Sequence, residues 1–145
     1  MTRNGFTLVE LIVVIAVMAL MAGAVVLTMG PGGSDAAPIA DRFASRVAAA
    51  RDSAVVDGRP TGVWVTASGY GFEQYRGGGW QPLTAKPFEG RDWGKGIAAS
   101  VAGAPGGRVR FDTMGLPSDP LAVTIGSGAE HAVVRVAANG DVVAD

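Results

Sequence analysis

The sequence lacks several of the side chains on which enzyme chemistry depends. It contains no cysteine, which excludes disulfide bonds, thiolate nucleophiles and cysteine-based metal sites. His131 is its single histidine, so it has no partner for a zinc site or a catalytic triad, and we expect it to be a structural residue of a strand. Asp112 and Asp119 flank a predicted turn, where a weak calcium site stays open as an alternative, although calcium needs about six oxygen ligands. We therefore expect no enzyme activity, no cofactor, no metal and no small-molecule substrate.

The sequence also lacks an excess of either positive or negative charge. The 145 residues include 12 basic and 13 acidic side chains, which gives a formal net charge of −1. No excess of positive charge predicts a nucleic-acid partner or an anionic binding surface. Glycine, by contrast, is abundant at 22 residues, and because its doublets and triplets separate short apolar segments, they indicate turns rather than disorder.

Long apolar runs are missing from most of the chain but not from its beginning. Residues 11–27 are Ala, Val, Ile, Leu and Met with one Gly. A helix over residues 6–29 is roughly 36 Å long at 1.5 Å per residue, more than the ~30 Å hydrocarbon core of a bilayer. We therefore expect a transmembrane helix at 6–29, with Arg3 favouring a cytoplasmic N-terminus. A secretory signal peptide with small residues at 22–24, or a plain membrane anchor, stays open.

Glu10 interrupts the apolar character of this segment near its start. A carboxylate within a membrane segment costs on the order of a few kcal/mol, so it is a functional candidate that needs a partner. The residues Gly5-Phe6-Thr7-Leu8-Val9-Glu10 resemble the prepilin signature of type IV pilins and type II secretion pseudopilins. The resemblance implies that prepilin peptidase removes residues 1–5 by cutting after Gly5 and that the new N-terminal Phe6 is N-methylated.

Cleavage after Gly5 creates an α-ammonium group on Phe6, four residues before Glu10. This spacing places the two charges on one face of a helix. The carboxylate of Glu10 then pairs with the ammonium of its own chain or with that of a neighbouring subunit. We therefore expect Glu10 to act in filament assembly.

A second helix is predicted after a break. Gly30-Pro31-Gly32-Gly33 ends the first helix, so residues 30–35 are predicted to be a linker that gives a swivelled two-helix arrangement. The next segment carries apolar residues at spacings of three and four, the pattern of an amphipathic helix: Ile39, Phe43, Val47, Ala50 and Ala54. We expect its arginines on the solvated side: Arg42, Arg46 and Arg51. Gly58 and Pro60 are expected to end this helix.

Short segments rich in β-branched and aromatic residues follow, separated by turn signals. Seven of them are predicted to be strands: 62–66, 70–75, 97–102, 108–112, 121–125, 131–136 and 142–143. A long connection is expected at 82–96, with Trp80 and Trp93 beside loops where they are either core residues or partner contacts. One helix followed by strands predicts an α+β domain at 36–145, with the amphipathic helix packed on a largely antiparallel β-sheet.

Several segments of this domain resemble the H-type minor pseudopilins of type II secretion: 39–43, 49–54, 57–60, 108–112 with Gly115, and 136–143. The resemblance implies a pilin-like fold and a structural subunit at the tip of a periplasmic pseudopilus that helps export folded proteins. It implies the major pseudopilin, minor pseudopilins of the I, J and K types, prepilin peptidase and inner-membrane lipid as partners. The chain is then a single-pass inner-membrane protein with a periplasmic C-terminal domain. Glu10 speaks against the K type, which is expected to lack this glutamate.

A minor type IV pilin of the same superfamily, acting in pilus biogenesis or DNA uptake, is the alternative. That branch is expected to carry basic residues near its C-terminal end to bind phosphates. Here the last predicted hairpin has an acid at Asp141, and the two arginines at Arg108 and Arg110 are followed closely by Asp112. These residues favour the secretion subunit and give no reason to expect nucleic-acid binding.

Overall fold

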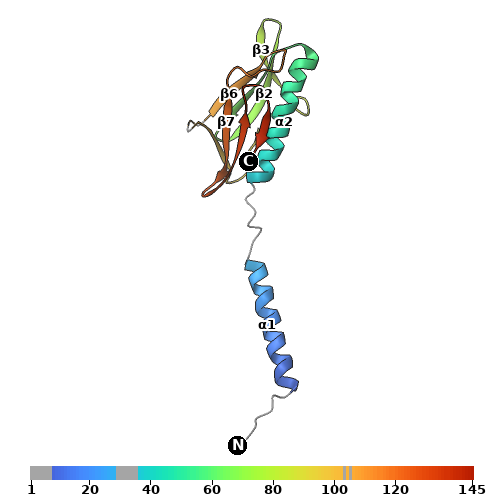
Figure 1. The fold of residues 1–145 in the computed structure, drawn as a ribbon, viewed down its shortest axis with the longest axis vertical. Coiled ribbons are helices and arrows are strands. Elements are labelled where there is room, and N and C mark those ends of the chain that lie inside the picture. Colours follow the sequence, from blue (N-terminus) through green and yellow to red (C-terminus); the bar gives the residue numbers. More distant parts are fainter. Residues whose placement is uncertain (1–7, 29–35, 103, 105) are drawn as a thin grey trace, which may run out of the picture. The chain divides into compact units, whose positions relative to one another are not determined.

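The computed structural model describes residues 8–28, 36–102, 104 and 106–145. The chain divides into two compact units, Met1–Gly33 and Ser34–Asp145. In the first unit, α1 spans Leu8–Thr28 (Figure 1). Glu10 lies in its first turn, where a carboxylate complements the positive end of the helix dipole. Among the described residues, no helix is long and apolar enough to cross a membrane. The predicted linker at 30–35, with its swivel, lies outside the described residues.

The second unit begins with α2, Ala36–Asp57, which confirms the predicted amphipathic helix. Its buried face contains most of the predicted apolar positions together with small alanines between them: Ala36, Ala40, Phe43, Ala44, Val47, Ala50 and Ala54. The helix ends where Gly58 adopts a positive φ of 60° and the Arg59 amide donates to the Ala54 carbonyl at 3.1 Å. Glycine permits this left-handed residue because it has no Cβ to clash with the backbone.

The described strands form two antiparallel sheets rather than the one sheet expected. Sheet A has the order β3-β2-β1-β6, with β4 paired to β2, and contains β1 (Thr61–Thr66), β2 (Gly69–Arg76), β3 (Gly79–Leu83), β4 (Arg91–Asp92) and β6 (Gly106–Phe111). Sheet B has the order β5-β7-β8-β9 and contains β5 (Ala98–Val101), β7 (Leu121–Ser127), β8 (Glu130–Val136) and β9 (Val142–Ala144). Strand alternation fixes which face of a strand is buried but not which strand it pairs with, so the division into two sheets was not predictable from the pattern.

A single hydrophobic core joins α2 to the inner faces of both sheets. The helix packs against strands of sheet A and sheet B (Figure 1). Fully buried residues come from all three layers, among them Phe43 of α2, Phe72 of β2 and Ile125 of β7. Trp93 belongs to this core, because it is only 3% exposed and its indole Nε1 donates to the Thr66 carbonyl at 3.0 Å. The structure therefore places Trp93 among the core residues and not among partner contacts.

Arg46 departs from the prediction that the arginines of α2 are solvated. Its side chain is 11% exposed. Its guanidinium donates to the Tyr70 hydroxyl at 2.9 Å, to the Pro87 carbonyl through Nε at 2.8 Å and to the Glu89 carbonyl at 2.7 Å. The expected long connection supplies these carbonyls, and a guanidinium has enough donors to satisfy several at once. Arg46 thus fastens residues 87–89 to α2, while Arg42 is exposed as expected.

Candidate functional site

The residues expected to direct processing and assembly lie at the start of the chain. Gly5 and Phe6, the expected cleavage and methylation positions, lie outside the described residues. Glu10 lies on α1 with an exposed side chain. The apolar side chains near it on the same helix are exposed as well, from Leu8 at 75% to Val14 at 43%. This part of α1 therefore presents a carboxylate among uncovered aliphatic side chains.

The residues considered for metal chemistry have local roles. Asp112 accepts hydrogen bonds at Oδ1 from the amides of Met114 and Leu116, both at 2.9 Å, so its carboxylate organises the turn after β6. His131 lies on β8 with an exposed side chain. Within the described part of the chain, no group of three or more His, Asp or Glu side chains is placed to hold a metal ion.

The most distinctive surface of the globular unit is the face of sheet A that turns away from the core, here called the outer face. Along β1 the buried Val63 and Val65 alternate with Trp64, and along β6 the buried Val109 alternates with Arg108. Because neighbours in a strand point to opposite sides, the residues between the core positions gather on the outer face. They are Trp64, Glu73, Tyr75, Trp80, Arg108 and Arg110.

Two glycines allow large side chains to lie flat on this face. Gly71 is paired with Trp64, and a Cβ on Gly71 would lie 2.3 Å from Cζ2 of the indole. Gly62 is paired with Glu73, and a Cβ on Gly62 would lie 2.8 Å from Cγ of the glutamate. Any side chain at either glycine would displace its partner. Glycine at both positions therefore lets Trp64 and Glu73 lie close to the backbone of the sheet.

The charged residues of the outer face are linked to one another. Glu73 on β2 extends across Gly62 toward β6, where its Oε1 lies 3.4 Å from Nε of Arg108 and 3.5 Å from Nε of Arg110. The guanidinium of Arg110 also lies over Trp80, with Cζ 4.4 Å from the ring centroid. The arginine side chains remain 49% and 41% exposed, whereas that of Glu73 is 11% exposed. The accessible charge of this cluster is therefore positive.

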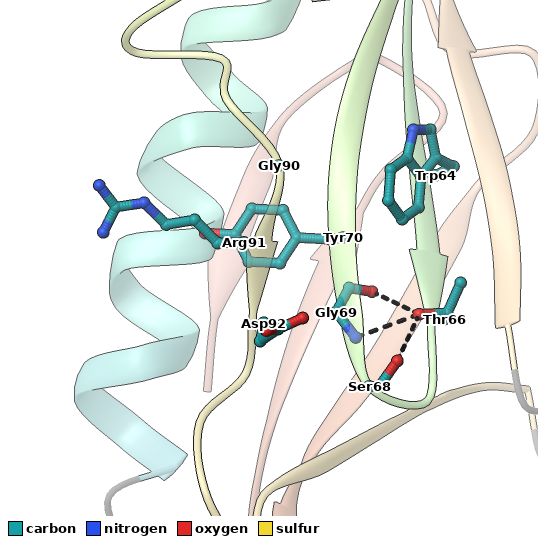
Figure 2. A pocket seen from close by; sticks show the side chains of 8 residues that line it. All are labelled: Trp64, Thr66, Ser68, Gly69, Tyr70, Gly90, Arg91 and Asp92. Atoms are coloured by element: carbon teal, nitrogen blue, oxygen red, sulfur yellow. Dashed lines mark hydrogen bonds between the residues drawn. The ribbon is translucent and has the colours of Figure 1, made fainter. Parts of the chain in front are cut away.

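A hollow of about 220 Å³ adjoins Trp64 at the end of this face (Figure 2). One wall is the β1–β2 turn, where the Thr66 hydroxyl accepts from the Gly69 amide at 3.1 Å and lies 3.4 Å from Ser68 Oγ. Asp92, paired with Gly69, lies across from this turn. Pockets for drug-sized molecules usually measure about 300–1,000 Å³, so this hollow suits a single side chain better than a small-molecule substrate.

The connection that ends at this hollow is held by charge pairs. Arg91 donates to Oε1 of Glu89 at 2.8 Å, and this hydrogen bond lowers the pKa of Glu89 and raises that of Arg91. Nη2 of Arg46 lies 3.4 Å from Oε2 of the same carboxylate. Glu89 thus receives two guanidinium groups, which fixes the backbone that leads into β4.

The sequence predicted strands at most of these positions but not the outer face itself. The sequence pattern predicts Arg108 and Arg110 to be solvated residues of a strand and places Trp80 beside a loop. The available signal was the alternation of Trp64, Arg108 and Arg110 with buried valines. Their assembly into one surface depends on the strand order β3-β2-β1-β6, which brings β3 and β6 into one sheet although they are far apart in the chain.

Two family models match the chain. The model described as type II transport protein GspH matches residues 40–140, and the model of the prokaryotic N-terminal methylation motif matches residues 1–26. The type II secretion system protein H of Aeromonas hydrophila is 34% identical over 93 residues. That alignment covers 61% of this chain and 51% of the relative, so the chain spans about half the length of the curated relative it matches.

Solved structures share the fold of the globular unit. The minor pseudopilin EpsH from the type 2 secretion system of Vibrio cholerae superposes with a TM-score of 0.65 at 22% identity, covering 77% of this chain and 97% of that one. The type IV minor pilin FimU of Pseudomonas aeruginosa gives 0.58 at 16% identity, covering 74% and 90%. GspH of E. coli gives 0.59 at 16% identity, covering 74% and 84%. Because the GspH model matches well over half of its residues, the protein belongs to the GspH family of type II transport proteins.

Proposed function

We propose that this chain is a minor pseudopilin of a type II secretion system and that it assembles at the tip of a periplasmic pseudopilus that helps export folded proteins. One observation carries the proposal: a match to the GspH family over residues 40–140 stands on the same chain as an N-terminal methylation motif over residues 1–26. The first match indicates the secretion branch, and the second indicates processing and membrane delivery.

Processing begins at the N-terminus. Prepilin peptidase cuts after Gly5 and the new N-terminal Phe6 is methylated. Glu10, in the first turn of α1, then faces the ammonium group of Phe6 in the same chain or in a neighbour. Pairing relieves the cost of placing a carboxylate among aliphatic side chains, and pairing between subunits sets the axial register of the filament.

The helix that carries Glu10 delivers the chain to the inner membrane, where it forms a single pass with a cytoplasmic N-terminus and a periplasmic C-terminal domain. Consecutive apolar residues from Leu11 to Ile15 are all exposed in α1, and five consecutive positions point to every side of a helix. A helix that is apolar on all sides needs lipid or other helices around it. Its neighbours are inner-membrane lipid before assembly and, afterwards, the major pseudopilin and the minor pseudopilins of the I, J and K types.

Gene deletion tests this proposal. Cells lacking the gene should accumulate the exported proteins in the periplasm, and the full-length chain supplied from a plasmid should restore export to the medium. A variant with Gly5 replaced by Arg should migrate as an unprocessed precursor and fail to restore export. Normal export by the deletion strain, together with loss of surface pili or of DNA uptake, would instead assign the chain to a type IV pilus or DNA-uptake system.

The alternative function is that of a minor type IV pilin, and the similarity of the fold to FimU favours it as a second candidate. DNA binding by such a pilin requires several cations whose charge is not offset by neighbouring acids. Arg108 and Arg110 are the arginines of the outer face, and both share the carboxylate of Glu73. We expect the full-length chain to shift no DNA at micromolar concentration in an electrophoretic assay. Binding that weakens as salt is raised would favour the alternative.

A further inference from the structure

We propose that the outer face of sheet A is a docking surface for a neighbouring filament subunit and that the neighbour presents a carboxylate-bearing segment of its globular domain to Arg108 and Arg110. The inference rests on the proposed function, because it identifies which surface of the chain meets another subunit and by what chemistry.

The outer face has no covering element among the described residues. Its partly buried residues are covered by one another: Trp64 lies on Gly71, Glu73 lies on Gly62, and Arg110 lies over Trp80. The opposite face of the same sheet, by contrast, is sealed by α2 and sheet B. Tryptophan, tyrosine and arginine are the residue types that contribute most energy at protein interfaces, and here they share one exposed sheet face.

The charge of this face selects an acidic partner. Glu73 is largely covered, whereas the two arginines that it contacts are each more than 40% exposed, so their side chains are accessible to a partner. A guanidinium is a rigid fork that matches a carboxylate with two hydrogen bonds. Contacts with Glu73 and Trp80 hold these forks in place before a partner arrives, which reduces the entropy lost on binding. Glu73 therefore acts as a positioning residue.

The hollow beside Trp64 supplies a second point of contact. Trp64 stands between the two features, because it lines the hollow and is the register partner of Arg108 on β6. At about 220 Å³ it accepts one side chain of a docking segment. Phosphates of nucleic acid fit this arrangement less well, because Glu73 lies between the arginines and offsets part of their charge. A protein surface with carboxylates and one protruding side chain matches both features.

The absence of native cysteine allows a clean test in the full-length chain. Pro82 is exposed and is paired with Glu73 in the register of β2 and β3, which places it at the border of the outer face. A single-cysteine variant, P82C, is labelled with a photoactivatable maleimide in spheroplasts of the complemented deletion strain and then irradiated. D52C, on an exposed position of α2, is the matched control.

We expect P82C to cross-link to the globular domain of another pilin-like subunit, at a peptide that contains Asp or Glu, and D52C to give at least tenfold less of that product. R108E/R110E in the P82C background should lower the yield about tenfold, since two interfacial ion pairs are reversed. Replacing the mapped carboxylates of the partner by arginine should restore it. E73Q should raise the yield severalfold, because the glutamine keeps an oxygen acceptor beside both arginines but removes the negative charge that competes with the carboxylate of the partner; a higher yield cannot result from misfolding.

Several outcomes would overturn the inference. Equal cross-linking from P82C and D52C, a yield unchanged by R108E/R110E, or a product between two copies of this chain would each contradict it. An electrophoretic shift of DNA by the full-length chain that becomes stronger in E73Q would contradict the inference and would favour nucleic acid as the partner. Export and processing are scored in the same cells: if both remain normal while the cross-link is absent, the docking inference fails and the proposed function stands. If the wild-type chain does not restore export, the proposed function itself fails.

Discussion

At the scale of single residues, the outer face depends on Gly71, whose lack of a side chain leaves room for the indole of Trp64. Gly71→Ala should displace the indole of Trp64, because the new Cβ would lie 2.3 Å from the present position of Cζ2. We expect a loss of about 1–3 kcal/mol in the free energy of unfolding, as for other overpacked sites. Denaturant titration measures this loss, and tryptophan fluorescence should report a more solvated indole. Gly79→Ala is the control, since a Cβ there meets nothing within 4 Å; equal losses in the two variants would contradict the packing role.

A second residue-scale feature joins the end of α2 to β2. Oδ2 of Asp57 accepts hydrogen bonds from Ser53 Oγ at 2.8 Å and from Gln74 Nε2 at 3.1 Å. The Ser53 bond, followed by the Gln74 bond, lowers the pKa of Asp57 from its ordinary value of 3.8. A carboxyl whose pKa is lower in the folded chain stabilises the fold above the unfolded pKa, and this stability is lost as pH falls through the folded pKa.

The pH dependence of unfolding tests this link. In the wild-type chain the midpoint should decline more steeply below about pH 4 than in Asp57→Asn, which cannot titrate at this position. Asp52→Asn changes an exposed acid on the same helix and should leave the acid limb close to wild type. Matching acid limbs in the wild type and in Asp57→Asn would show that the two hydrogen bonds do not stabilise the ionised form.

At the scale of elements, Arg46 joins a helix to an irregular connection. Arg46→Met removes the donors that hold the carbonyls of Pro87 and Glu89 and should cost about 2 kcal/mol of unfolding free energy. Arg46→Lys keeps the charge but not the fork, so it should recover only part of this loss. Hydrogen exchange at residues 84–90 should accelerate in both variants. Arg42→Met, on the exposed side of α2, is the control and should change neither quantity.

Under the proposed function, α1 acts in assembly through one side chain, that of Glu10. Glu10→Leu should leave membrane insertion and cleavage after Gly5 intact, because neither requires a carboxylate at this position, but it should abolish most assembly by removing the charge that pairs with an ammonium group. Electrophoresis separates precursor from mature chain, and export to the medium reports assembly. Glu10→Asp, which retains the charge, is the matched variant and should preserve part of the export. Normal export by Glu10→Leu would remove this residue from the mechanism.

Elements were the scale at which the sequence predicted best. The spacing of apolar residues in α2 and their alternation in the strands arise because each element buries one face. These patterns can be read directly from the sequence. β3 and β4 were missed, since Pro82 and the polar Arg91-Asp92 pair resemble a connection when their pairing to β2 is unknown. The outer face could not be predicted for the same reason, because it depends on which strands pair. Arg46 was placed wrongly because a charged side chain off the apolar stripe is normally solvated, and only the path of residues 87–89 surrounds it with acceptors.

At the scale of the whole molecule, the two compact units differ in how they are stabilised. The described core of the second unit consists of residues that lie between positions 36 and 144. A chain of about 110 residues with its own core is large enough to fold alone. The N-terminal unit, by contrast, exposes its described aliphatic side chains and needs partners or lipid to cover them. The proposed anchoring and the proposed recognition therefore belong to different units, which accords with a methylation motif and a family domain that match different residues.

This separation predicts that residues 34–145 fold without the first unit. The fragment should unfold in one cooperative transition, and its midpoint in denaturant should match that of the full-length chain in mild detergent, because the fragment contains every residue of the described core. A fragment that begins at residue 45 is the control: it lacks Ala36, Ala40, Phe43 and Ala44, all buried against the sheets. Removing Phe43 alone from such a core costs about 3–5 kcal/mol, so the shorter fragment should be largely unfolded. A lower midpoint for residues 34–145 than for the full-length chain would mean that the first unit stabilises the second directly.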